Sequence, residues 1–309
     1  MFGVAACTKG RQSASNLRLG GIGTRRFYKA QTSLRKGKAV ASHRTPYKSF
    51  LSGIAIMFID SHCHINFPEL VKNIDEVLAN MRQNEVTHAL CVSVNLENFP
   101  QVLSLAEQYD HIYASAGVHP DHESDTEPTQ AKLEQLAQHP KIVAIGETGL
   151  DYFRLKGDLE WQRQRFRTHI RAARTCRKPL IIHTREAAAD TLRIMAEEGA
   201  SEIGGVMHCF TESLEVAEAA IEMNFYISFS GIVTFKNATA LKEVAQRIPL
   251  ERMLIETDSP YLAPMPFRGK LNQPAYVKHV AEEIARLRGI SLDEVGRATT
   301  KNFRRLFLS

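Results

Sequence analysis

Two histidines one residue apart, His62 and His64, follow a short apolar run that begins at Met57. In a β-strand alternate side chains point to the same face, so both imidazoles would project to one side. Two imidazoles on one strand end supply half of a four-coordinate shell for zinc or a similar ion. Taken alone, the pair is equally compatible with two surface histidines where a strand meets a loop. The rest of the chain has to decide between the two interpretations.

Further short runs rich in Val, Ile, Ala and Phe recur along the chain and are typical of buried strands. With the run at 57–64 they make eight, the others lying at 87–94, 112–118, 142–146, 179–183, 204–209, 225–230 and 252–258. Strands that alternate with helices form parallel βαβ units, and eight such units predict a closed barrel. An open doubly wound sheet is the alternative, but no GxGxxG follows the first strand.

Amphipathic stretches with helical spacing separate the apolar runs. Examples lie at 73–84, 159–174, 187–198, 214–223 and 238–247, and two more, 274–288 and 291–307, close the chain. The predicted fold class is therefore α/β, a (β/α)8 TIM-like barrel over residues 57–309.

The carboxyl ends of the strands in such a barrel converge on one mouth, where the catalytic groups of these barrels lie. Six ionisable side chains stand at these predicted ends: His62, His64, Glu147, His183, His208 and Asp258. Each alone is as readily a hydrogen-bonded core or turn group, and Asp258 before Ser259 and Pro260 suits a turn cap better. Four imidazoles and two carboxylates at one mouth instead predict a site for two divalent ions.

The five cysteines are odd in number and form no CxxC pair, which indicates a reducing compartment rather than a disulfide framework. No apolar run approaches the length of about 20 residues that crosses a bilayer. We expect a soluble protein, located in the cytoplasm, with no membrane association and no obligate protein partner.

Residues 1–56 differ from the rest, because they hold eleven basic residues and no acidic one, while 57–309 carry 28 basic against 34 acidic residues. We expect this basic N-terminal extension to be disordered, since its composition cannot build a core. It resembles a mitochondrial transit peptide, and it would also suit a basic arm for nucleic acid. We favour a third interpretation, a spurious upstream extension with Met57 as the start, because a barrel whose first strand opens there needs nothing before it.

The chain from Met57 to about Phe307 resembles the TatD-related metal-dependent deoxyribonucleases of the amidohydrolase-like barrel superfamily. The motifs that carry the resemblance are DSHCH at 60–64, GVHP at 117–120, GETGLDY at 146–152, HTRE at 183–186, HCF at 208–210, SFSG at 228–231 and ETDSPYL at 256–262. The resemblance implies a metal-dependent hydrolase that removes nucleotides from DNA ends, as an exonuclease. It implies that the metal ligands are His62, His64, Glu147, His183, His208 and Asp258.

We expect two divalent ions, Mg, Mn or Zn, that activate a water for attack on phosphorus. The expected holders of the first ion are His62, His64 and Asp258. The expected holders of the second are His183 and His208, and Glu147 would bridge the two ions. Asp258 would also accept the proton of the attacking water, which makes Asp258 and Glu147 the expected catalytic residues. Glu256 either supports a ligand or forms a structural ion pair.

Candidate substrate contacts are His119, Arg185 and the basic residues Arg268 and Lys270 of the loop 266–272. Each is equally compatible with a buried histidine or a solvated basic loop, and Tyr152 and Tyr261 are weaker candidates for stacking on a base. Because the body is mildly acidic, we expect local binding of a DNA end, single-stranded, rather than a grip on a long duplex.

Two other classes of function remain open. An amide, lactone or ester hydrolase of the same superfamily, acting for example on an aminoacyl ester, would use the same metals. The superfamily's amide hydrolases often bridge their metals with a carboxylated lysine where this chain has Glu147, which favours the nuclease. A metal-bound binding module without activity is the third class, and six intact ligands around an open mouth disfavour it.

Overall fold

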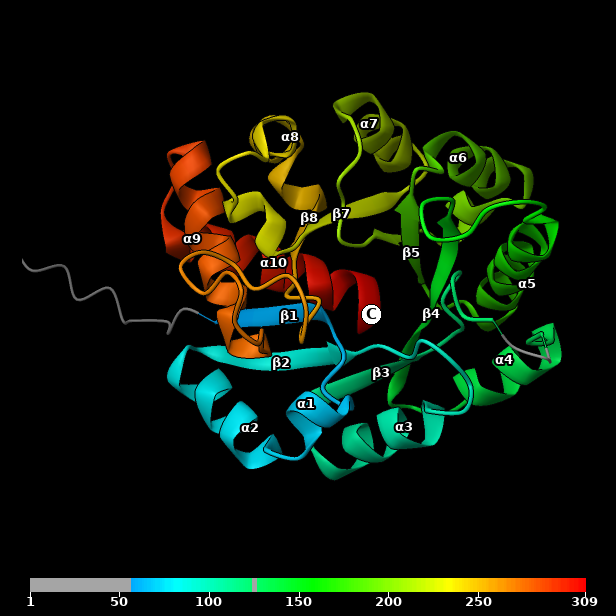
Figure 1. Cartoon of the computed structure of the whole chain (residues 1–309), viewed down its shortest axis with the longest axis horizontal. Coiled ribbons are helices and arrows are strands. Elements are labelled where there is room, and N and C mark those ends of the chain that lie inside the picture. The colour runs from blue at the N-terminus through cyan, green and yellow to red at the C-terminus, as the bar shows by residue number, and fades with distance from the viewer. Residues whose placement is uncertain (1–56, 124–126) are drawn as a thin grey trace, which may run out of the picture. The chain divides into compact units, whose positions relative to one another are not determined.

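The computed structural model describes residues 57–123 and 127–309, so the predictions for the extension 1–56 lie outside the described residues. Eight parallel strands pair in chain order from β1 to β8, with helices around them (Figure 1). They are β1 (Phe58–Cys63), β2 (Val86–Cys91), β3 (Ile112–Ala116), β4 (Ile142–Asp151), β5 (Leu180–Arg185), β6 (Gly205–Met207), β7 (Phe225–Phe229) and β8 (Met253–Ile255). The predicted α/β fold, a (β/α)8 TIM-like barrel, is confirmed, and each predicted run overlaps one strand.

Backbone contacts between the first and last strands complete the barrel at its mouth. The amide of Asp258 donates to the carbonyl of His62 at 2.9 Å, and the amide of His64 donates to the carbonyl of Ser259 at 2.8 Å. Cys63 and Ser259 form the matching bridge. The two histidines of the first strand are thereby fixed beside Asp258.

Ten α-helices are described: α1 (Pro68–Val71), α2 (Ile74–Gln83), α3 (Phe99–Gln108), α4 (Gln130–Ala137), α5 (Glu160–Cys176), α6 (Ala188–Glu197), α7 (Leu214–Glu222), α8 (Thr239–Arg247), α9 (Val277–Arg288) and α10 (Leu292–Phe307). Each predicted helical stretch overlaps one of them. The predicted stretches did not include α1, α3 or α4. None of the helices in the described part of the chain is long and apolar enough to cross a membrane, and the predicted cytoplasmic location stays a prediction.

Helix α10 covers the barrel end opposite the mouth. Its N-cap Ser291 accepts the amide of Glu294, acidic residues stand in its first turn and arginines in its last, an arrangement that suits the helix dipole. Thr300 donates to the carbonyl of Met57, and Asn302 donates to that of Met253, at the amino ends of β1 and β8. In Figure 1 this helix, in red, crosses behind the strands.

Two buried apolar sets hold the layers together. The larger lies between the strands and the surrounding helices. The smaller fills the barrel with the inward side chains of alternate strand residues, such as Ile59, Leu90 and Ile181, and with Phe303 of α10. This interior is packed rather than open, so the space for chemistry lies above it at the mouth.

Strand β4 is longer than the predicted run, which ended at Gly146. It continues to Asp151 and pairs with β5, with Gly149 opposite His183. A Cβ on Gly149 would lie 2.0 Å from the carbonyl oxygen of His183, so only glycine permits this pairing. As a result Glu147 lies inside a strand and not at its end.

Candidate metal centre

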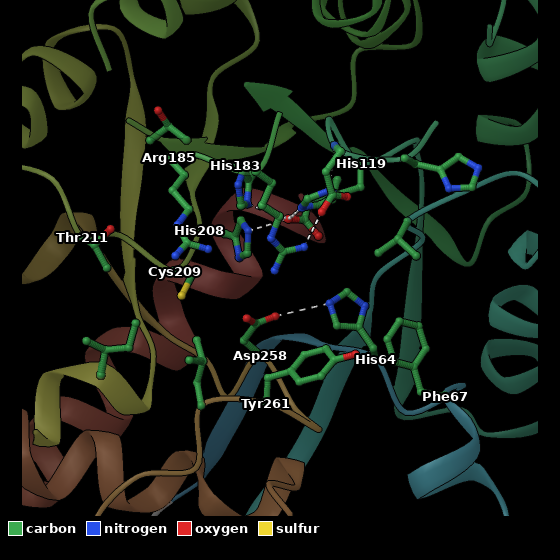
Figure 2. A pocket seen from close by; sticks show the side chains of 18 residues that line it. His64, Phe67, His119, His183, Arg185, His208, Cys209, Thr211, Asp258 and Tyr261 are labelled. Carbon is green, nitrogen blue, oxygen red and sulfur yellow. Dashed lines mark hydrogen bonds and ion pairs between the residues drawn. The ribbon is translucent and has the colours of Figure 1, made fainter. Parts of the chain in front are cut away.

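The mouth of the barrel holds a cavity of about 580 Å³. Five of the six predicted metal ligands line it, and the sixth, His62, is fully buried directly below. Figure 2 shows the labelled histidines and Asp258 pointing toward one another from different strands. The six side chains predicted from the strand ends are therefore gathered at one place.

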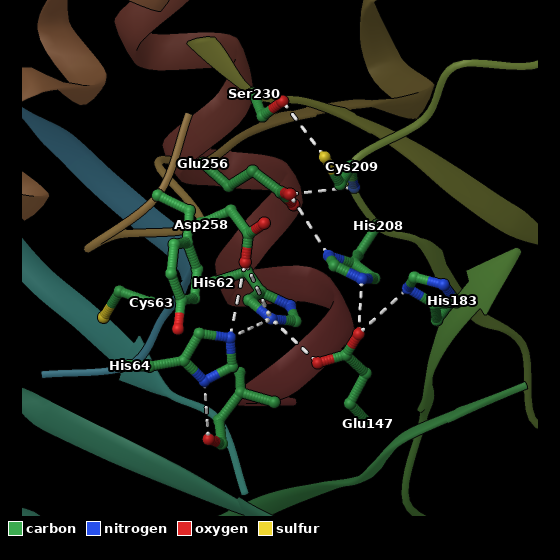
Figure 3. Close-up of polar contacts among 12 residues, drawn as sticks. His62, Cys63, His64, Glu147, His183, His208, Cys209, Ser230, Glu256 and Asp258 are labelled. Atoms are coloured by element: carbon green, nitrogen blue, oxygen red, sulfur yellow. Dashed lines mark hydrogen bonds and ion pairs between the residues drawn. The ribbon is translucent and has the colours of Figure 1, made fainter. Parts of the chain in front are cut away.

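His62, His64 and Asp258 form the first group of candidate ligand atoms (Figure 3). The two Nε2 atoms lie 3.3 Å apart, and Asp258 Oδ1 lies 3.3 Å from His64 Nε2 and 3.7 Å from His62 Nε2. The side chain of Asp258 is 17% exposed, whereas that of His62 is 1% exposed. The carboxylate therefore faces the cavity while the imidazole lies beneath it.

Glu147 lies between this group and a second one. Its Oε2 is 3.3 Å from His62 Nε2, while its Oε1 is 2.7 Å from His208 Nε2 and 3.3 Å from His183 Nδ1. Each carboxylate oxygen thus faces a different set of imidazole nitrogens. This separation is the geometry that a bridging carboxylate requires.

The outer nitrogens of three histidines are held by acceptors. His64 Nδ1 lies 3.1 Å from the carbonyl of Val92, His183 Nε2 lies 3.1 Å from Asp151, and His208 Nδ1 lies 3.2 Å from Glu256. A carbonyl or carboxylate only accepts, so each outer nitrogen carries the proton. In the neutral ring the inner nitrogen then presents a lone pair, as a metal ligand must.

Charges inside the site compensate one another. Burial alone would raise the pKa of Glu147, but the imidazoles of His208, His119 and His62 hold it well below its usual range. Burial opposes protonation of His208, yet the carboxylates of Glu147 and Glu256 raise its pKa well above the usual range. Burial and the neighbouring His208 lower the pKa of His62. The carboxylates of Glu147 and Glu256 therefore favour a positive charge among these side chains.

The residues fit a metal ion. His208 Nε2 is buried and has no hydrogen-bond partner among the described residues, although Glu147 Oε1 lies 2.7 Å away. An unpartnered buried nitrogen is costly unless an ion takes its lone pair. Nitrogen and oxygen donors together suit zinc, and they also suit Mn and Mg when the oxygens dominate.

Two carboxylates that were not predicted from the sequence hold the candidate ligands or the strand that carries them. Asp151 is buried, holds His183 through Oδ2 and accepts the amides of Phe153 and Arg154 through Oδ1. Asp60 accepts the amide and the hydroxyl of Thr257, which joins β1 to the segment after β8. Their place within GETGLDY and DSHCH, close to predicted ligands, was the available signal. The sequence carried no signal for their hydrogen-bond partners His183 and Thr257, because these residues lie far away in the chain.

Glu256, for which two roles were open, is fully buried. Its Oε1 accepts the amide of Cys209 at 2.8 Å in addition to its contact with His208. It therefore touches a predicted ligand on the side away from the cavity, as expected of a residue that orients that ligand.

The candidate substrate residues separate into two sets. His119 and Arg185 line the cavity. His119 Nε2 lies 3.2 Å from Glu147 Oε1, and although burial opposes it, the carboxylates of Glu147 and Asp121 raise the pKa of His119 to about 9. Arg268 and Lys270 are exposed, over the rings of Phe235 and Phe267, and lie outside the cavity lining among the described residues. Their contact with substrate stays a prediction.

The two tyrosines proposed for base stacking also differ. Tyr261 lines the cavity and is 56% exposed, which suits a stacking surface. Tyr152 instead donates its hydroxyl to Asp190 at 2.7 Å. Arg154, which the sequence analysis did not select, lines the cavity and pairs with Asp121.

Comparison with known proteins agrees with this site. The family model described as TatD related DNase matches residues 59–308. The chain is 45% identical over 255 residues to the metal-dependent hydrolase YcfH of Escherichia coli (strain K12), covering 82% of this chain and 96% of that protein. It is also 45% identical to the metal-dependent hydrolase YabD of Bacillus subtilis (strain 168), covering 81% and 99% respectively.

Among solved structures, the TatD homologue YJJV of Escherichia coli superposes with a TM-score of 0.75 at 31% sequence identity, covering 82% of this chain and 98% of that one. The sequence match, the fold and the clustered ligand atoms agree. The chain belongs to the TatD related DNase family of metal-dependent hydrolases.

Proposed function

We propose that the protein is a deoxyribonuclease that hydrolyses phosphodiester bonds at single-stranded DNA ends with two divalent ions. The observation that carries the proposal is the position of Glu147, whose two oxygens face different groups of imidazoles. The family description, TatD related DNase, supports nucleic acid as the substrate.

In this proposal His62, His64 and Asp258 hold one ion, His183 and His208 hold the other, and Glu147 contacts both. When bound, the ions lower the pKa of a water and stabilise charge on the phosphoryl oxygens of the substrate. Asp151 and Glu256 keep His183 and His208 in the tautomers that ligation needs.

Asp258 is the proposed acceptor of the proton from the attacking water. It is a partly exposed carboxylate of the first group, and contact with His64 and the nearby His62 hold its pKa below the usual range although burial opposes this. A carboxylate that is ionised and faces the cavity can take a proton at neutral pH. Its backbone φ of 54° is unusual outside glycine, and it is held by the hydrogen bond that the amide of Asp258 donates to the carbonyl of His62.

Substrate entry is proposed through the cavity at the mouth. Its volume of about 580 Å³ suits a nucleotide-sized group rather than a duplex. His119 and Arg185 are the proposed contacts inside the cavity. Arg268 and Lys270 would contact only those parts of the DNA strand that remain outside the cavity. Because the body carries no excess of basic residues, binding depends on these local contacts.

The test is a substrate panel on the full chain after chelation and addition of Mg, Mn or Zn. The substrates are single-stranded DNA labelled at either end, duplex DNA, RNA and an aminoacyl ester. Release of mononucleotides from single-stranded DNA, restored by metal and lost in Glu147→Gln, is expected. Hydrolysis of the aminoacyl ester alone would overturn the nuclease assignment and leave a hydrolase of carbonyl esters.

A further inference from the structure

Arg185 and Phe153 form a stacked pair at the edge of the mouth. The guanidinium carbon of Arg185 lies 3.9 Å from the centre of the Phe153 ring. Phe153 is 49% exposed, so the pair lies at the surface and is open to a ligand. The arginine lines the cavity that contains the candidate metal ligands, and Figure 2 shows its side chain among theirs.

The donors of Arg185 are available. Within the described residues, the arginine takes part in neither an ion pair nor a side-chain hydrogen bond, whereas the neighbouring Arg154 is paired with Asp121. Stacking occupies one face of a guanidinium and leaves its N–H edge free for a bidentate acceptor. The pair therefore presents an unneutralised, oriented cation to the cavity.

Position relative to the metal ligands is fixed through the backbone. Arg185 lies two residues after His183 in β5, so both side chains leave the strand on the same face. The amide of Tyr152 donates to the carbonyl of Arg185 at 2.9 Å, and Asp151 holds the amide of Phe153 as well as the ring of His183. The carboxylate of Asp151 thus positions both the backbone that carries the Phe153 ring and the imidazole of His183.

We infer that Arg185, held flat by Phe153, binds the phosphate next to the one that is hydrolysed. The inference rests on the proposed nuclease function and gives the site a second phosphate subsite. Two residues along β5 span about 6.6 Å, which is comparable to one nucleotide step of an extended strand. Arg185 is then a substrate-binding residue, and Phe153 is a positioning residue that acts through it.

The test compares d(TpT), which has one phosphodiester, with d(TpTpT), which is longer by one nucleotide and has two, with chromatographic detection of released thymidine products. Arg185→Gln should lower kcat/KM for d(TpTpT) by roughly tenfold to a hundredfold, the loss of a charge-assisted hydrogen bond, mainly through KM. The loss on d(TpT), which lacks the second phosphate, should be clearly smaller than the loss on d(TpTpT). Arg297→Gln, on α10 and paired with Asp293, is the matched control.

Variants of the ring separate positioning from simple folding effects. Phe153→Leu should reproduce part of the loss on d(TpTpT), and Phe153→Tyr, which keeps an aromatic face, should restore it. The slope of log kcat/KM against log salt should fall by about 0.7 in Arg185→Gln, as for one lost contact to single-stranded phosphate. Metal content and thermal midpoint of each variant are measured alongside.

The outcomes are distinct. Equal losses on both substrates in Arg185→Gln, or no loss on either, would overturn the second phosphate subsite while the nuclease stands. Equal behaviour of Phe153→Leu and Phe153→Tyr would remove the positioning role of the ring. Failure of the wild type to hydrolyse either substrate with any of the three metals would overturn the proposed function, and the inference with it.

Discussion

His169 in α5 allows a quantitative prediction about pH and stability. The ring is fully buried, its Nε2 accepts the amide of Val118 at 3.1 Å, and its Nδ1 lies 2.8 Å from the carbonyl of Arg165. Val118 directly precedes His119, so this histidine supports one wall of the cavity. Both ring nitrogens are used by the neutral form, and burial lowers the pKa of His169 to about 4.

The magnitude follows from linkage. Above about pH 6.5 the residue is neutral in the folded and unfolded protein, so its contribution is complete. As the pH falls toward about 4, the unfolded chain binds a proton that the folded protein does not, and stability is lost. Each fall of one pH unit lowers the free energy of unfolding by about 1.4 kcal/mol. The loss is therefore about 2 kcal/mol between pH 6.5 and 5, and about 3 kcal/mol by pH 4.

The measurement is urea denaturation of the wild type and His169→Gln, with chelator present, between about pH 7.5 and 5. Glutamine can accept the Val118 amide but does not titrate. It should cost stability at pH 7.5, and its deficit should shrink by about 2 kcal/mol at pH 5. His139→Gln, at the surface beside Glu107, serves as a control. A deficit that stays constant across this range would refute the argument that His169 is held neutral.

Further predictions concern the metal centre and the start of the fold. Glu147→Gln should reduce bound metal, by elemental analysis, together with turnover, since it removes the charge between the two groups. Asp258→Asn should lower kcat by roughly a hundredfold or more, and full rescue by excess metal would exclude its role as the base. Because nearby carboxylates raise the pKa of His208, metal uptake near neutral pH should release protons, seen by calorimetry in buffers of different ionisation enthalpy. A chain beginning at Met57 should keep the thermal midpoint of the full chain, because β1 begins at Phe58, and a clear drop would contradict this.

The barrel was predictable because strands buried on both faces read as apolar runs. The clustering of the candidate ligands was predictable because parallel strands end at one mouth, which brings together His62 and Asp258 from opposite ends of the body. Short helices were harder to predict. α1 covers only Pro68–Val71 and carries a proline in its first turn, which marks a helix start but leaves too few turns for a clear period.

Irregular segments limited how much of the candidate site could be predicted from the sequence. The loop that holds Arg268 and Lys270 has no period, so charge alone could not tell which side chains reach the cavity. The same holds for contacts such as that between Asp151 and His183, which depend on the register of β4 and β5. The register of β4 and β5 depends on the close approach of the Gly149 backbone to the carbonyl of His183, which the sequence alone does not show.

The seam between β1 and β8 has a consequence for how the enzyme matures. His62 and Asp258, joined there by a backbone hydrogen bond, lie nearly two hundred residues apart in the chain. A nascent chain emerging from the ribosome therefore carries His62 and His64 long before Asp258 exists, and cannot assemble the first ligand group. Contacts of such separation form late in folding. The first group of candidate ligands should thus be completed only after synthesis is nearly complete.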